Sequence, residues 1–270
     1  LISESGEFNQ FDMIAENLLK VRREYGPEAT VFYVGYPKWF RPAMLRFANL
    51  YGSPNFCTES STCFQAAALA WKSIYGNRIC GPDLNNTKTL LIWSSNLYHS
   101  KTTTSGSYQA LKKRGVKIID VDPRHTVTAH DADLHLQLIP GTDGALALSM
   151  GQVIIEEDLY DQDFVENYVF GFEEYREYDK IRRAARLYAG NGPASLMFSA
   201  SPIVHHISGV QNYRAIFSLV ALTGNYDVEG GNRTQSGPFS PANEFGKVKR
   251  YDGKEAIGQK DFPVWFDLPC

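Results

Sequence analysis

Short apolar runs alternate with amphipathic stretches along most of the chain. The runs at 89–95, 116–121, 134–139 and 194–200 are almost continuous in apolar residues, which is typical of strands buried on both faces. Between and after them, apolar residues recur at helical spacing. This spacing predicts helices at 107–115, 142–155, 162–189 and 210–224. Strands and helices in this alternation predict an α/β fold, with a parallel sheet between two layers of helices.

The first 76 residues carry a shorter version of the same pattern. We expect a helix that ends at Gly26 and Pro27, a strand over 29–34, and helices over 42–52 and 63–76. From about residue 225 the composition shifts to Gly, Asn, Ser and Pro, and no regular element is predicted there.

The composition limits the classes of protein to consider. The 270 residues are 43% hydrophobic and 21% charged, so the chain can bury a large core in one domain or two. Its formal net charge of −3, without a large basic cluster, argues against a nucleic-acid partner. No apolar run is long enough to span a bilayer, so we expect no direct membrane insertion. The four cysteines form no CxxC pair, which leaves the compartment open between cytoplasm and periplasm.

Polar residues follow three of the predicted strands. In an open α/β sheet, ligands bind beyond the carboxyl ends of the strands, where loops meet helix N-termini. Acids there can accept hydrogen bonds from ribose or guanine, and Arg, Thr and backbone N–H groups can hold a diphosphate. The residues at these strand ends are Ser94, Ser95, Asn96, His99, Ser100, Asp120, Asp122, Arg124, His125, Thr126, Gly141, Thr142 and Asp143.

Two alternatives remain for these strand ends. Asp122 and Asp143 could only cap turns and helices, although three polar strand ends together favour a site. A nucleotide site of the common kinds is not supported, because neither GxGxxG nor GxxxxGK[ST] occurs in the chain.

Cys63 is the second candidate. It follows a Ser/Thr stretch and stands at the start of the helix expected at 63–76, where the positive end of the helix dipole suits metal ligation or nucleophilic chemistry. Simple packing is the alternative for any single cysteine, and it is our interpretation of Cys57, Cys80 and Cys270.

Taken together, these motifs resemble the molybdopterin-dependent oxidoreductases of the dimethyl sulfoxide reductase type. The segment LRFANLYGSPNFCTESSTC is similar to the stretch that leads into the family's metal-ligand position. The family's guanine-dinucleotide-binding stretches are matched by LIWSSNLYHS, by KIIDVDPRHTVTAHDADLHLQLIPGTDGALALSM and by LVALTGNYDVEGGN. The order and spacing of these segments make the resemblance specific.

The resemblance implies a role for each candidate. Cys63 would be the protein ligand to molybdenum or tungsten, and thus the catalytic residue. One molybdopterin guanine dinucleotide would be lined by Ser95, Asn96, Asp122, Arg124, Thr142 and Asp143. His205 and His206 would line the active site, or serve only as hydrogen-bonded loop residues.

The resemblance also implies a Rossmann-like parallel sheet sandwiched by helices, with part of a second α/β domain. We expect the first part of that second domain over 1–60, the dinucleotide-binding domain over 61–230, and a segment over 231–270 that returns to the first. The family's cysteine cluster for a [4Fe-4S] centre and its β-barrel domain are absent from the sequence. The chain therefore resembles an internal fragment, with any iron–sulfur centre in a missing N-terminal part and no cofactor bound to the fragment alone.

The implied function is two-electron redox or oxo transfer on a small substrate, with an electron-transfer subunit as a candidate partner. Phe64 occupies the position where formate dehydrogenases of the family carry a histidine, so we expect poor formate oxidation. A catalytically silent pterin-fold subunit and an unrelated nucleotide-binding α/β enzyme are the alternatives. The substrate, the choice between molybdenum and tungsten and the oligomeric state stay open.

Overall fold

A computed structural model of the chain describes residues 10–37, 39–76, 80–100, 102–168 and 182–233, together with positions 256 and 260. The chain divides into two compact units. The smaller unit combines Leu1–Ser61 with Gly237–Cys270, and the larger unit is Thr62–Ser236.

The smaller unit is built around a parallel pair of short strands. Its elements are α1 (Gln10–Tyr25), the 3-10 turn η1 (Pro27–Ala29), β1 (Phe32–Val34), α2 (Arg41–Tyr51) and β2 (Phe56–Thr58), followed by the 3-10 turn η2 (Glu59–Thr62). β1 pairs with β2 in parallel, with Phe32 opposite Phe56. Gly52 ends α2 with a φ of 97°, a conformation that glycine adopts without steric cost.

The core of this unit is small. Phe32, Ala48 and Tyr51 are its buried residues, and the Phe32 ring meets the Tyr51 ring edge-on at 5.4 Å. The Tyr51 hydroxyl donates to the Leu18 carbonyl at 2.7 Å and so ties α1 to α2. The periodicity predicted α1 correctly, yet none of its residues is buried.

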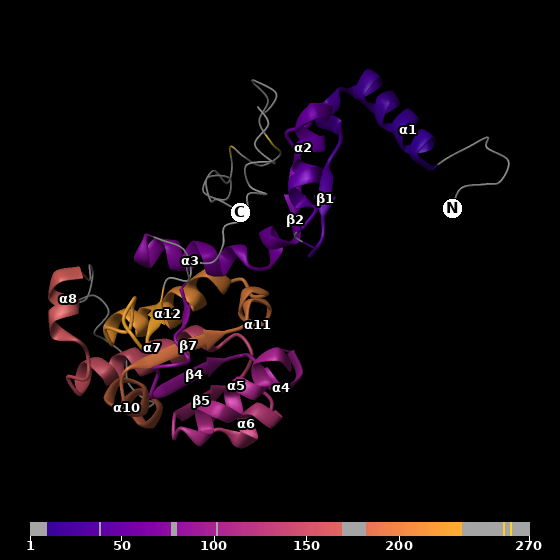
Figure 1. The fold of residues 1–270 in the computed structure, drawn as a ribbon. Coiled ribbons are helices and arrows are strands. Elements are labelled where there is room, and N and C mark those ends of the chain that lie inside the picture. Colours follow the sequence, from indigo (N-terminus) through magenta and orange to yellow (C-terminus); the bar gives the residue numbers. More distant parts are fainter. Residues whose placement is uncertain are drawn as a thin grey trace. The chain divides into compact units, whose positions relative to one another are not determined.

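The larger unit carries the main sheet (Figure 1). Its strands are β3 (Gly81–Pro82), β4 (Thr89–Trp93), β5 (Lys117–Val121), β6 (Leu134–Leu136), β7 (Ala194–Phe198) and β8 (Asn232–Arg233). Its helices are α3 (Gln65–Tyr75), α4 (Leu97–Ser100), α5 (Thr102–Lys113), α6 (Val127–Asp131), α7 (Asp143–Glu156), α8 (Gln162–Tyr168), α10 (Arg182–Gly190), α11 (Ala200–Val204) and α12 (Gly209–Leu222). Four strands form a parallel sheet in the order β6-β5-β4-β7, and β3 pairs with β8 in a separate antiparallel pair.

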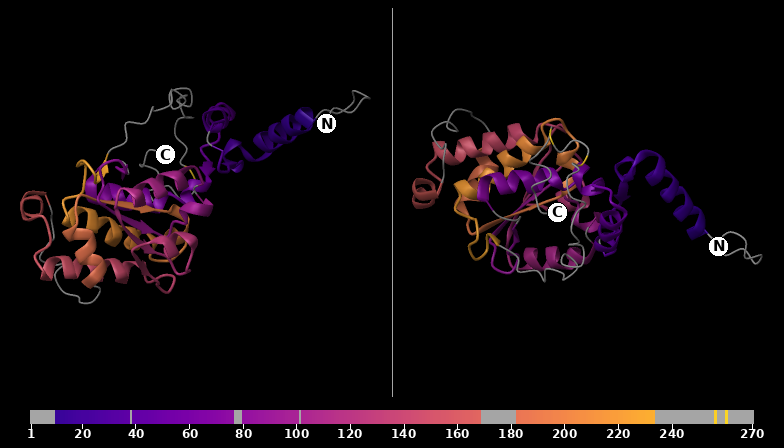
Figure 2. Two further views of the ribbon diagram at one scale, coloured as in Figure 1. Left: turned by 60° about the horizontal axis from the view of Figure 1, so that its bottom comes forward. Right: turned by 90° about the horizontal axis from the view of Figure 1, so that it is seen from above.

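Alternate side chains of the sheet point into two helical layers. On one face, Leu91 and Trp93 of β4 pack into the larger core with residues of α3, α7, α10 and α12. On the other face, Leu90 and Ile92 pack with Leu97 of α4 and with residues of α5. Figure 2 shows the sheet between these layers from two further directions. The predicted α/β fold, a parallel sheet covered on both faces, is confirmed.

Most predicted element boundaries agree with the structure, and a few differ. The strand expected at 29–34 begins only at Phe32, because residues 27–29 form η1. The helix expected over 162–189 corresponds to α8 and α10, and residues 169–181 between them lie outside the described residues. Within the described part of the chain, no helix has the length and apolar character needed to cross a membrane.

Candidate cofactor-binding site

β4 ends in a tight turn that carries two of the predicted nucleotide-binding residues. Ser94 has a φ of 51°, in the left-handed region that residues other than glycine seldom adopt, and its N–H donates to the Val121 carbonyl at 2.7 Å. Ser95 is 2% exposed, and its hydroxyl has no hydrogen-bond partner in the described part of the chain. Asn96 accepts a hydrogen bond from the Thr128 hydroxyl at 3.1 Å. Ser95 therefore leaves a buried hydroxyl available to a ligand.

The turn after β5 places the acidic Asp122 next to the positively charged Arg124. Asp122 is buried, and its Oδ1 accepts a hydrogen bond from the Arg124 backbone N–H at 2.8 Å. The Arg124 side chain is 76% exposed, and its Nε lies 3.8 Å from the same carboxylate oxygen. Asp122 thus fixes the turn, while most of the Arg124 guanidinium faces solvent, where it can meet a phosphate.

Asp120 is a second acid on the same strand. It is 1% exposed, and its Oδ2 has no hydrogen-bond partner. Burial, with a smaller contribution from the charge of Asp122, raises the pKa of Asp120 to about 7. This carboxyl group can therefore be protonated at neutral pH, unlike an ordinary surface aspartate.

The segment between β6 and α7 supplies the third strand end. Asp143, the first residue of α7, is buried and accepts a hydrogen bond from Trp93 Nε1 at 2.8 Å. Thr142 is exposed, and its hydroxyl donates to the Ile139 carbonyl at 2.7 Å. The Trp93–Asp143 hydrogen bond joins the start of α7 to the end of β4, two strands away from β6 in the sheet.

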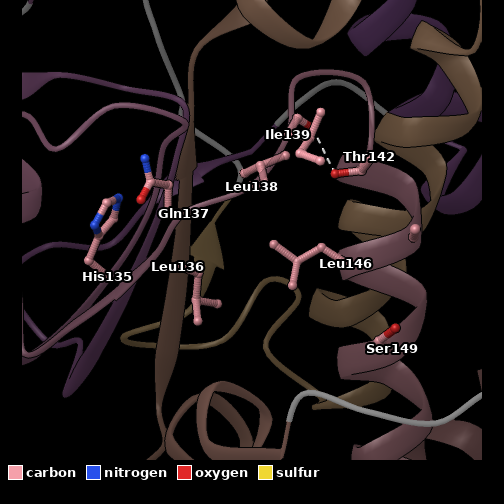
Figure 3. Close-up of a pocket in the computed structure, with 9 residues that line it drawn as sticks. His135, Leu136, Gln137, Leu138, Ile139, Thr142, Leu146 and Ser149 are labelled. Carbon is pink, nitrogen blue, oxygen red and sulfur yellow. Dashed lines mark hydrogen bonds between the residues drawn. The ribbon is translucent and has the colours of Figure 1, made fainter.

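An open groove lies between the end of β6 and α7 (Figure 3). It encloses about 470 Å³ and has both polar and apolar walls. Its lining residues are His135, Leu136, Gln137, Leu138, Ile139, Thr142, Ala145, Leu146 and Ser149. Thr142 belongs both to this groove and to the strand-end residues, so the groove opens at the edge where the predicted ligand residues lie.

Cys63 lies two residues before α3 and is half-buried. Tyr213 is a fully buried residue of α12, and its hydroxyl donates to the Ser199 carbonyl at 3.0 Å. Burial, Cys63 and Asp143, in that order, raise the pKa of Tyr213 far above its usual value. Cys63 and Asp143 both influence the pKa of Tyr213, and Tyr213 itself contacts the loop that follows β7.

The two histidines after β7 differ in their surroundings. His205 is exposed, whereas His206 is half-buried. A Cβ atom on Gly141, which has a φ of 93°, would lie 3.3 Å from His206 Nδ1. His206 therefore lies against the turn that leads into α7, and its role as an active-site residue stays a prediction.

The side chains near Cys63 could hold a metal ion only together with ligands from another group. Among the described residues, no cluster of three or more His, Cys, Asp or Glu side chains could hold a metal ion by itself. A metal at Cys63 would need its remaining ligands from a cofactor, such as the dithiolene sulfurs of a pterin. The buried Ser95 hydroxyl, without a partner, fits a cofactor that also reaches the end of β4.

Three residues of this edge were not predicted from the sequence. Trp93 donates to Asp143, Tyr213 has a pKa that Cys63 helps to raise, and Asn212 is a buried amide at the start of α12. Asn212 could have been found from the sequence, because it is a polar residue on the buried face of an apolar helix. The other two depend on contacts between distant segments.

Comparison with known proteins identifies relatives of this chain and its fold. The family model for molybdopterin oxidoreductase matches residues 9–268. Acetylene hydratase from Syntrophotalea acetylenica is 32% identical over 93% of this chain and 38% of its own length. Formate dehydrogenase H from Escherichia coli is 31% identical over 78% of this chain and 33% of its own.

A solved structure shows the same relationship. Acetylene hydratase from Pelobacter acetylenicus superposes with a TM-score of 0.72 at 33% identity, covering 82% of this chain and 33% of that chain. The molybdopterin-containing subunit of thiosulfate reductase from Salmonella typhimurium is 28% identical over 82% of this chain and 31% of its own length. The chain thus spans about a third of the length of the curated relatives it matches.

Proposed function

The chain belongs to the molybdopterin oxidoreductase family, of the dimethyl sulfoxide reductase type, and we propose that it forms the central cofactor-binding portion of a molybdenum or tungsten enzyme that acts on a small substrate. Membership implies a pterin cofactor with one of these metals and excludes an unrelated nucleotide-binding α/β enzyme. The observation that carries the proposal is the convergence of polar side chains from three strand ends on one edge of the parallel sheet.

We infer that the pterin is present as its guanine dinucleotide. Asp122 and Asp143 are buried carboxylates at neighbouring strand ends, and carboxylates accept hydrogen bonds from guanine N–H groups and ribose hydroxyls. Arg124 offers an exposed guanidinium for a phosphate, and Ser95 offers its buried hydroxyl. Asn96 and Thr142 complete the proposed set at the ends of β4 and β6.

Cys63 is the residue that would ligate the metal. A cysteine sulfur is a soft donor, suited to molybdenum or tungsten between dithiolenes. When bound, this cofactor supplies two-electron redox or oxo-transfer chemistry, while the protein sets ligand identity, hydrogen bonding and access. Near Cys63, the Tyr213 hydroxyl is already engaged with the Ser199 carbonyl. Its contribution in this proposal is therefore to hold the loop after β7 in place.

The residue after Cys63 bears on the substrate. Phe64 is 40% exposed and can neither donate nor accept a proton, so it offers no acid–base help beside the metal. We therefore propose that the parent enzyme oxidises, reduces or hydrates a small substrate other than formate. Robust formate oxidation by the full-length protein would refute this choice.

The remainder of the enzyme would lie outside this chain. In our proposal, residues 1–60 and 231–270 belong to one α/β domain that further sequence completes, and 61–230 form the dinucleotide-binding domain. A [4Fe-4S] centre would belong to the part before residue 1, and an electron-transfer subunit is the proposed partner.

The test uses the full-length protein, expressed with the cofactor-synthesis machinery. We expect about one molybdenum or tungsten per chain, together with pterin and guanine nucleotide released by acid. Cys63→Ser should keep the pterin, lose the corresponding metal–sulfur distance in X-ray absorption spectra, and lose most turnover. Cys57→Ser is the matched control, because the Cys57 sulfur is half-buried and contacts the Phe32 carbonyl at 3.8 Å.

Two outcomes would contradict the proposal. Full-length protein without metal or pterin would favour the catalytically silent subunit. A Cys63→Ser variant with wild-type turnover and an unchanged absorption spectrum would remove Cys63 from the metal site.

A further inference from the structure

Asn212 is a buried amide whose nitrogen has no hydrogen-bond partner among the described residues. It is 4% exposed, it lies in the first turn of α12, and its Nδ2 makes no hydrogen bond. A buried amide N–H without a partner costs free energy, so such a group in a folded protein calls for an explanation. A bound ligand that accepts this hydrogen bond is one explanation.

The amide stands next to an acid that is proposed to bind the cofactor. A Cβ atom on Gly144 would lie 2.7 Å from Asn212 Oδ1, so the Asn212 side chain is pressed against the first turn of α7. Asp143, the residue before Gly144, is also buried, and one of its oxygens accepts from Trp93. In the first turns of α7 and α12, the Asn212 amide therefore packs against the residue next to the buried Asp143 carboxylate.

This pairing matches one kind of heterocycle. Guanine presents two N–H donors, on N1 and N2, beside the O6 acceptor, and the pterin ring repeats that pattern in its 2-amino-4-oxopyrimidine part. A carboxylate can accept from the two donors while an amide N–H donates to the oxygen. Adenine reverses the pattern at the corresponding positions and would leave both protein groups unpaired.

We propose that Asn212 acts with Asp143 to recognise the 2-amino-4-oxopyrimidine edge of the bound cofactor, with Asn212 donating to the ring oxygen. The inference rests on the proposed function and adds a specificity-determining residue to that site. Polar residues at strand ends do not include Asn212, because it lies on α12, 69 positions after Asp143 in the chain.

The test compares two substitutions in the full-length protein. Asn212→Leu removes the donor at similar volume, and Asn212→Asp replaces the donor with an acceptor that opposes the ring oxygen. We expect each to speed cofactor loss roughly tenfold or more, as for one lost hydrogen bond to a buried group. Pterin and nucleotide contents after timed dialysis are the readout. Gln152→Leu is the control, because Gln152 is a buried amide farther along α7 whose Nε2 donates to Glu156.

Apo protein, made in a host that lacks pterin synthesis, shows whether the recognised edge belongs to guanine or to the pterin ring. Weakened binding of guanosine monophosphate by both variants, with adenosine monophosphate bound poorly throughout, assigns the edge to guanine. Weakened binding of a free pterin alone assigns it to the pterin ring. Both results support the proposal.

Structural and functional failures are also distinguishable. If Asn212 were only an unpaired core residue, Asn212→Leu would raise the melting temperature of the apo protein and leave cofactor retention unchanged. Unchanged retention and unchanged affinity for both probes in both variants would overturn the inference alone. Wild-type protein without any pterin would overturn the proposed function as well.

Discussion

Trp93 makes the clearest single-residue contribution to the candidate site. Its Nε1 donates to Asp143 at 2.8 Å, and both residues are buried. Phenylalanine would keep much of the ring but leave the Asp143 carboxylate with one partner fewer. We expect Trp93→Phe to lower the free energy of unfolding by about 1–3 kcal/mol and to reduce cofactor content. Urea denaturation and pterin analysis of the full-length protein measure these two effects.

A second tryptophan separates the hydrogen bond from the loss of ring volume. Trp71 is also fully buried, but its Nε1 has no hydrogen-bond partner. Trp71→Phe should therefore lose packing alone and keep the cofactor. Equal loss of cofactor in both variants would contradict a specific role for the Trp93–Asp143 bond.

Asp120 makes stability depend on pH in the direction opposite to an ion-paired acid. Its folded pKa of about 7 lies above the unfolded value of about 3.9, so the folded state keeps a proton that the unfolded state releases. The contribution of Asp120 is therefore most favourable below about pH 4 and is lost as pH rises to about 7.

Replacing Asp120 by asparagine should remove this dependence. Relative to Asp120→Asn, the wild type should lose stability on the order of 4 kcal/mol between pH 4 and pH 8. Denaturant titrations at both pH values test this, with Asp163→Asn on the exposed face of α8 as the control. Parallel pH profiles for wild type and Asp120→Asn would show that Asp120 does not carry the effect.

At the scale of residues, the sequence suggests which side chains belong to a site but not which side chains they contact. Asp122 follows an apolar run directly and Asp143 follows one after a short turn, so both are predictable from a local feature. The Trp93–Asp143 bond joins residues 50 positions apart, and Asn212 meets Gly144 only through the packing of α12 on α7. Such pairs depend on the fold, so no local pattern predicts them.

Among the elements, predictability follows length and apolar content. The apolar runs predicted β4, β5 and β7 because fully buried strands leave long apolar signatures. β2 and α6 were not predicted, since three and five residues carry too little periodicity. Such short elements depend on their neighbours: β2 on its pairing with β1, and α6 on its cap.

The cap of α6 gives a prediction at this scale. Thr126 is its N-cap residue, and the Thr126 hydroxyl accepts a hydrogen bond from the Ala129 N–H at 3.1 Å. Thr126→Ala should lower the free energy of unfolding by about 1 kcal/mol, whereas Thr126→Ser keeps the acceptor and should be close to neutral. Thermal denaturation of the two variants measures the difference, and equal melting temperatures would exclude a stabilising cap.

At the scale of the whole molecule, the described parts of the two units differ in how well their strands are covered. The larger unit buries a four-stranded parallel sheet between helices, which is the usual environment of such a sheet. Among its described residues, the smaller unit has two parallel strands, and Tyr33 of β1 is exposed. A parallel pair open on one face is unusual, and it agrees with our proposal that further sequence completes this domain.

The open binding edge of the larger unit predicts how the 270-residue chain behaves alone. The proposed ligand residues line one edge of one sheet, and the groove beside Thr142 is open. A ligand that is enclosed on one side only buries little of its surface and loses much of its binding free energy. We therefore expect the isolated chain, expressed with the cofactor machinery, to purify with far less than one pterin per chain.

Pterin fluorescence after acid oxidation measures this directly, with the full-length protein as the positive control. The chain spans about a third of the length of its curated relatives, and in our proposal further sequence of the full-length protein encloses the ligand. A stoichiometric pterin on the isolated chain would mean that Cys63, the strand ends and Asn212 suffice to hold the cofactor. The enclosing role proposed for the remaining sequence would then be wrong, even though the site residues would gain support.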